Sequence, residues 1–141
     1  DHRDLHSFPT RRSSDFDGAT MRITRSRPGG VEVVAWSARA GRWWRWAAPL
    51  AVRATDLQEA WLASYQLQGN EPGTVEALAG VQKQQLYAFV GSAWSYAKST
   101  GNVSAAQPSV TLLPDGLRLV LTLEGGPFVG TLQRSVQIVH P

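Results

Sequence analysis

The amino-acid sequence predicts an α+β domain made mostly of antiparallel strands, with one short helix. Most of the chain divides into short segments in which apolar and polar residues alternate, as in half-buried strands, and Gly or Pro separates these segments. One segment, at residues 56–68, instead has apolar residues spaced three and four apart. The chain has 141 residues, of which 43% are hydrophobic and 18% are charged. This composition suits a single globular domain with one sizeable core.

The first fifteen residues stand apart from this pattern. Residues 1–15 have neither strand nor helix periodicity. They can be read back into codons as one frame of a widely used short-read sequencing adapter, and the match ends at Asp15. We therefore interpret residues 1–15 as an adapter-derived artefact, expect them to be disordered, and assign residues 16–141 to the domain. On this interpretation, the sequence that preceded Phe16 is unknown, and the lost part leaves room for an N-terminal signal or membrane helix.

The first part of the domain predicts three strands. Residues 21–25 alternate between apolar and polar side chains, and the Pro-Gly-Gly sequence at residues 28–30 ends this strand in a turn. Residues 31–38 and 42–52 are rich in β-branched and aromatic residues, and Gly41 separates them. This pattern predicts a hairpin.

A helix is predicted next, at residues 56–68. Thr55 and Gln58 match a capping box, in which the Thr hydroxyl accepts from the backbone N–H of Gln58 and the Gln side chain reaches back. Gly69 supplies the expected stop. The residues at helical spacing are Leu57, Ala60, Trp61, Ser64 and Tyr65.

The second half predicts four more strands, at residues 74–78, 81–90, 117–124 and 131–139, with a polar loop at residues 98–109. The third of these strands has the cleanest alternation in the chain. Its inward residues are predicted to be Leu117, Leu119, Leu121 and Leu123. In the last strand, the expected dry face consists of Leu132, Val136 and Ile138, and Arg134 interrupts it.

One cluster of side chains is conspicuous, the run Arg42-Trp43-Trp44-Arg45-Trp46. Because strand side chains alternate, Trp44 and Trp46 share one face, and Trp43 and Arg45 share the other. Three interpretations stay open. The residues can form a cross-strand aromatic core, a stacking surface for bases or sugars, or a protein interface. Of the two functional interpretations, the protein interface is the candidate site, and its residues are Trp43, Trp44, Arg45 and Trp46.

The sequence contains little reactive chemistry. It has no Cys, which removes thiol catalysis, and it lacks the common zinc-protease, phosphate-loop and nucleophile-elbow motifs. His140 lies one residue from the end, where a solvated role is expected. Glu71 and Glu76 leave a calcium site open, but no calcium-loop signature accompanies them. We therefore expect no enzymatic activity, no catalytic residue, no resident metal and no cofactor.

The net charge of +3 is unevenly distributed. Residues 16–53 carry seven Arg against Asp17 and Glu32, whereas residues 54–141 carry more acids than bases. A small overall excess is a weak electrostatic footprint for nucleic acid. No nucleic-acid partner is expected.

Short motifs also occur in a recognisable order along residues 16–141. They are Met21-Arg22-Ile23-Thr24-Arg25, Gly41-Arg42-Trp43-Trp44-Arg45, Leu78-Ala79-Gly80-Val81, Trp94, Leu113-Pro114-Asp115-Gly116-Leu117-Arg118-Leu119-Val120-Leu121 and Gly130-Thr131-Leu132-Gln133-Arg134. In this order they resemble the soluble head of the general secretion pathway protein J family, the J-type minor pseudopilins of bacterial type II secretion systems.

The resemblance implies a β-rich pseudopilin head of antiparallel strands that normally follows an N-terminal membrane helix. It implies a non-enzymatic part, with I-type and K-type minor pseudopilins as partners at the tip of a short periplasmic filament. The tip complex would initiate the filament, which helps to push folded proteins across the outer membrane. The implied location is the inner membrane of a Gram-negative cell envelope, with the head in the periplasm and membrane contact only through the missing helix.

The sequence also departs from the family pattern. The prepilin cleavage motif and the apolar helix behind it are absent. Two alternatives remain open: a carbohydrate- or ligand-binding β-domain that uses the Trp-rich hairpin, and a minor pilin of a type IV pilus.

Overall fold

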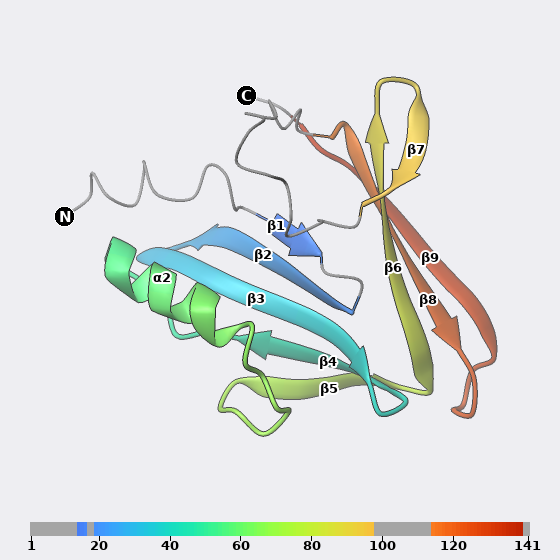
Figure 1. The fold of residues 1–141 in the computed structure, drawn as a ribbon, viewed down its shortest axis with the longest axis horizontal. Coiled ribbons are helices and arrows are strands. Elements are labelled where there is room, and N and C mark those ends of the chain that lie inside the picture. The colour runs from blue at the N-terminus through green and yellow to red at the C-terminus, as the bar shows by residue number, and fades with distance from the viewer. Residues whose placement is uncertain (1–13, 17–18, 98–113, 140–141) are drawn as a thin grey trace, which may run out of the picture.

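A computed structural model describes residues 14–16, 19–97 and 114–139. The described residues form two antiparallel sheets and one helix, so the predicted fold class is confirmed (Figure 1). The larger sheet, in the order β1-β2-β3-β4-β5, contains β1 (Ser14–Phe16), β2 (Thr20–Arg27), β3 (Gly30–Arg39), β4 (Arg42–Ala47) and β5 (Thr74–Ala79). The smaller sheet, in the order β7-β6-β8-β9, contains β6 (Val81–Val90), β7 (Ala93–Tyr96), β8 (Gly116–Leu123) and β9 (Gly130–Gln137).

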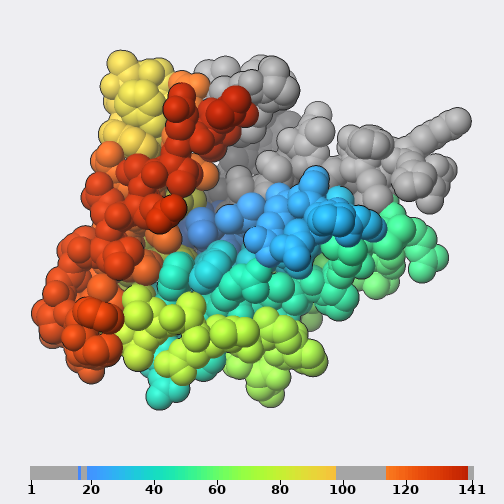
Figure 2. Space-filling model, turned by 180° about the vertical axis from the view of Figure 1, so that it is seen from behind, coloured from blue at the N-terminus to red at the C-terminus, as the bar shows by residue number. Residues whose placement is uncertain are grey.

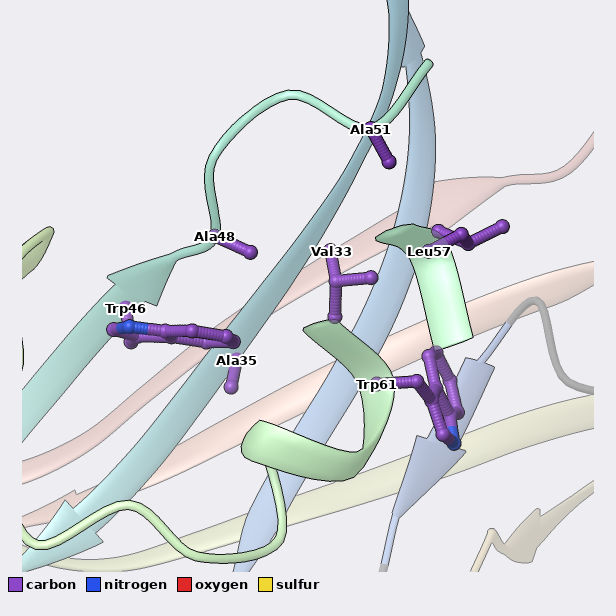
Figure 3. Packing of buried hydrophobic residues seen from close by; sticks show 7 residues of the cluster. All are labelled: Val33, Ala35, Trp46, Ala48, Ala51, Leu57 and Trp61. Atoms are coloured by element: carbon purple, nitrogen blue, oxygen red, sulfur yellow. The ribbon is translucent and has the colours of Figure 1, made fainter. Parts of the chain in front are cut away.

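The helix α2 (Ala54–Ala63) covers one face of the larger sheet (Figure 1). Its apolar residues Leu57 and Trp61 are buried against β3 and the segment that follows β4. Burial of this apolar surface is the main favourable term that holds the helix on the sheet. The buried cluster consists of Val33, Ala35, Trp46, Ala48, Ala51, Leu57 and Trp61 (Figure 3).

The smaller sheet packs against the opposite face of the larger one. Leu86 of β6 joins Phe16 and Met21 in one buried cluster. A second cluster brings Val81, Leu121 and Leu123 against Trp43 and other half-buried residues of the larger sheet. The larger sheet is therefore covered by a helix on one side and, over part of its length, by a sheet on the other.

The two sheets are joined directly at Gly80, which lies between β5 and β6. Gly80 has a φ of +80°, and a Cβ there would lie 2.8 Å from backbone atoms of Gly126. Since a side chain fits neither this backbone conformation nor this approach, position 80 requires glycine.

The helix differs from the prediction at both ends. It begins at Ala54 with Arg53 as its N-cap residue, and no side chain caps it. The predicted capping box of Thr55 and Gln58 is wrong, because Thr55 already lies inside the first turn. The helix ends at Ala63, five residues before the expected end, and tighter turns that close on Leu62 and Ala63 carbonyls follow it.

Two strands also differ from the prediction. β4 ends at Ala47, because the chain then leaves the regular ladder and pairs with β3 only through Ala48 and Ala51. β7 is a strand that the sequence did not predict, and it pairs with the end of β6. The loop predicted at residues 98–109 lies outside the described residues.

The leucine row of β8 is confirmed. Leu121 and Leu123 are buried, and Leu117 and Leu119 pack against the two inter-sheet clusters. The dry face predicted for the last strand is wrong for Leu132 and Val136, because every residue of β9 is exposed, whereas Ile138, just after β9, is half-buried. β9 is the edge strand of the smaller sheet and extends beyond the larger sheet that covers β6 and β8.

Two residues of the N-terminal segment belong to a strand. Ser14 and Asp15, which fall in the segment expected to be disordered, form β1 together with Phe16 and pair with β2. Residues 1–13 lie outside the described residues. Within the described ranges, no helix is both long and apolar enough to cross a membrane.

Candidate protein interface

The candidate residues lie on β4, between β3 and β5. Antiparallel pairing sets Trp36 opposite Arg45, and Ala35 opposite Trp46. Since paired residues point to the same side of a sheet, Trp44 and Trp46 face α2, whereas Trp43 and Arg45 face the smaller sheet. The alternation predicted from the sequence is confirmed, and the structure divides the four residues between two faces.

Trp46 belongs to the core beneath α2. Only 7% of its surface is exposed, and its ring lies beside Ala35 and Ala48 (Figure 3). A partner cannot reach this ring without opening the core. Of the interpretations left open by the sequence, the aromatic core describes Trp46.

Trp43 lies where the two sheets meet. Its ring stacks on Trp36, with 4.3 Å between the ring centroids and 27° between the planes. Its indole Nε1 donates a hydrogen bond of 2.7 Å to Oε1 of Gln84 on β6. The amide nitrogen of Gln84 donates in turn to the carbonyl oxygens of Trp36 and Ala19, at 3.0 and 3.2 Å. Trp43 is therefore part of a polar joint between the sheets.

Trp44 and Arg45 lie outside the three hydrophobic clusters and retain accessible surface. Trp44 is half-buried, and its indole donates to the carbonyl oxygen of Arg39 at 3.2 Å. Arg45 places its guanidinium 5.7 Å from the centre of the Trp36 ring and 4.0 Å from a carboxylate oxygen of Glu32. These two residues point to opposite faces of the sheet, so the run does not form one continuous binding surface.

Glu71 and Glu76 are engaged with different partners. The Glu71 carboxylate accepts hydrogen bonds from the backbone N–H groups of Gln68 and Gly69. The bond from Gln68 is the largest cause that lowers the pKa of Glu71, because it stabilises the ionised form. Glu76 instead pairs with Arg42 at 3.3 Å. Across the ranges that the structure covers, no group of three or more His, Cys, Asp or Glu side chains gathers as metal ligands.

Sequence reasoning missed two features of this region. Gln84 is buried and connects both sheets through three hydrogen bonds, although its strand position alone indicates only a polar residue. The apolar residues of β9 are exposed, although their alternation predicts burial. They are exposed because β9 is the edge strand of its sheet, and the strand order cannot be inferred from the alternation within β9. His140 lies outside the described residues.

Comparisons with known proteins give one informative similarity. No protein-family model matches the chain, and no curated protein matches it. Among solved structures, a chain of the crystal structure of the GspK-GspI-GspJ complex from the enterotoxigenic Escherichia coli type 2 secretion system is similar, with a TM-score of 0.54. The identity is 19%, and the match covers 86% of this chain and 68% of that chain.

At this level of identity, the similarity shows a shared fold. The described chain has a pseudopilin-like head fold, with two antiparallel sheets and a single short helix among its described residues.

Proposed function

We propose that this chain is the head domain of a J-type minor pseudopilin of a type II secretion system. In this role it joins the tip complex that initiates the pseudopilus and helps to push folded proteins across the outer membrane. One observation carries the proposal: the two-sheet head shares its fold, over 86% of its length, with a chain of the GspK-GspI-GspJ complex. The ordered motifs in the sequence, from Met21 to Arg134, independently support the J-type assignment.

The proposed role is structural and depends on contacts. The head takes I-type and K-type minor pseudopilins as partners, lies in the periplasm, and is anchored to the inner membrane by a helix upstream of Phe16. It performs no catalysis. The engagement of Trp43 in packing, and of Glu71 and Glu76 in local bonds, supports a role through shape rather than through a reactive centre.

The carbohydrate-binding alternative is not favoured by the geometry. A sugar-stacking platform needs aromatic rings on one accessible surface. Trp46 is buried under α2, Trp43 stacks at the sheet junction, and Trp44 points to the other face from Trp43.

A minor pilin of a type IV pilus has closely related architecture, so the experiment must separate the two systems.

The proposal is tested by deleting the gene in a bacterium that carries it. We expect folded substrates of the type II system to accumulate in the periplasm, and the full-length gene to restore their secretion. Twitching motility, which depends on type IV pili, should be unchanged. Normal secretion in the deletion strain, or loss of motility alone, contradicts the proposal.

A further inference from the structure

The smaller sheet extends an apolar row, which Arg134 interrupts, past its partner sheet. Leu132 of β9 pairs with Leu121 of β8, and Val136 pairs with Leu117, so all four side chains point to one face. Leu121 and Leu117 pack against the larger sheet. Leu132 and Val136, one strand further out, are 46% and 48% exposed. Within the described part of the chain, the inner face of the smaller sheet therefore leaves Leu132 and Val136 of β9 exposed.

The larger sheet also has an uncovered area, on the face that carries Trp36. Beyond the junction, this face presents Arg25, Glu32, Arg45 and Val75, which the register sets on the same side as Trp36. Val75 is 56% exposed. Figure 2 looks onto this face, with β9 in red at one side and strands β2 to β5, from blue to yellow-green, beside it. We name the area between β9 and these residues the inter-sheet corner.

The inter-sheet corner carries positive charge. Arg25 lies 2.6 Å from a carboxylate oxygen of Glu32, and Arg45 approaches the same oxygen at 4.0 Å. Arg27, two residues after Arg25, belongs to the same face of β2. The Glu32 carboxylate is thus approached by two guanidinium groups, and each planar guanidinium presents several N–H donors. The local excess of donors and positive charge favours carboxylates from outside.

We infer that the inter-sheet corner binds an amphipathic helix of a partner subunit, with an apolar stripe against Leu132, Val136 and Val75 and a row of carboxylates against Arg25 and Arg45. A helix suits this site because its apolar stripe spans a wide arc and can contact both sheets at once. The site contains apolar residues and cations together, which matches such a helix in both respects.

A second copy of this chain is a poorer occupant. The helix α2 buries its own apolar residues, Leu57 and Trp61, in the core. No other helix occurs in the described part of the chain that could supply a free apolar stripe. The inference rests on the proposed function in one respect: it takes the bound helix to belong to another subunit of the same assembly.

Two synthetic helical peptides test the inference. Both have leucines at helical spacing, one is flanked by glutamates, and the other has lysine at each glutamate position. In a fluorescence-anisotropy titration with this chain, we expect the glutamate peptide to bind at least about tenfold more tightly than the lysine peptide. The double variant Leu132→Asp/Val136→Asp should weaken binding of the glutamate peptide by about tenfold or more.

A charge-exchange variant keeps the test independent of the apolar residues. Arg25→Glu/Arg45→Glu should bind the lysine peptide better than the glutamate peptide. The matched control Thr131→Asp/Gln133→Asp changes the opposite face of β9 and should leave both affinities within about twofold. Circular dichroism and urea denaturation establish that each variant is folded.

Three results would overturn the inference. They are equal binding of both peptides, no binding of either peptide, and self-association of the chain in sedimentation that Leu132→Asp abolishes. Because the titration uses this chain alone, its failure leaves the secretion assay unaffected. Normal secretion in the deletion strain would instead remove the proposed function while leaving any peptide binding intact.

Discussion

At the scale of single residues, neighbouring tryptophans of β4 have different roles. Trp46 fills the core under α2, whereas Trp43 stacks on Trp36 and bonds Gln84 at the sheet junction. The alternation of a strand predicts that these side chains point to opposite faces of the sheet. It does not say which face packs against a helix and which packs against a second sheet. That assignment depends on residues far away in the sequence, such as Trp61 and Gln84, and so only the fold supplies it.

Replacement of Trp46 by alanine should destabilise the protein more than replacement of Trp44. We expect Trp46→Ala to lower the free energy of unfolding by about 3–5 kcal/mol, because it removes a large buried side chain and leaves a cavity. Trp44 points to the same face but is only half-buried, so Trp44→Ala should lower the free energy of unfolding by roughly 1–2 kcal/mol. Urea denaturation followed by circular dichroism measures both values, and equal losses would contradict the assigned packing.

Gln84→Leu should also destabilise, although leucine is apolar and of similar size. The change removes the acceptor of the Trp43 indole and the Gln84 donor bonds to two backbone carbonyls, at a cost of about 1–3 kcal/mol. Gln85→Leu, at the neighbouring position on the other face of β6, is the control and should stay within about 0.5 kcal/mol of the parent. If both variants have the parent's stability, Gln84 is not a structural joint.

At the scale of elements, the alternation within a strand predicts burial correctly for a central strand but not for an edge strand. The strict alternation of β8 predicts its buried leucines correctly, because period-two patterning reports directly on a half-buried strand. The same reasoning fails for Leu132 and Val136, since an edge strand can have alternating apolar residues although no second sheet packs against them. β7 escapes prediction because its four residues are all exposed and too few to show a period. The exposed corner beside β9 could not be predicted for the same reason.

The uncapped start of α2 can be improved. Arg53 has the extended backbone of an N-cap residue, with φ −116° and ψ 155°, but its side chain bonds no helix N–H. Arg53→Ser should stabilise the protein by about 0.5–1 kcal/mol, because the hydroxyl can accept from the first turn. The loss of the exposed Arg53–Asp56 ion pair offsets little of this gain. Arg53→Ala is the control, and a thermal-melting gain shared by both variants would contradict the capping explanation.

The loop after α2 should respond to acid. Since the folded pKa of Glu71 is lowered, its stabilising effect is present above the usual carboxyl pKa and is lost as the pH falls through the folded value. Glu71→Gln should therefore narrow the difference in stability between neutral and acidic pH. Carbon-detected NMR titration, with the variant used to assign the signal, measures the Glu71 midpoint. A midpoint at or above the usual carboxyl value contradicts the hydrogen-bonded arrangement.

At the scale of the whole molecule, the two sheets support a protein that works by contact. The charge that the sequence concentrates before residue 54 lies in part on one face, where Arg25 and Arg45 approach Glu32 and Arg27 lies further along β2. The composition predicts the cationic excess, but only the register places it on the face of the larger sheet that meets the smaller sheet. Shape, apolar area and charge then occur together on one side of the head, as expected of an assembly subunit.

The central claim is that this head assembles with the I-type and K-type minor pseudopilins of its own secretion system. The most direct measurement mixes the three purified heads and determines their mass by size-exclusion chromatography with light scattering. We predict a single complex that contains all three heads in equal amounts. Separate elution of this chain, under conditions in which the other two heads associate, would contradict the account.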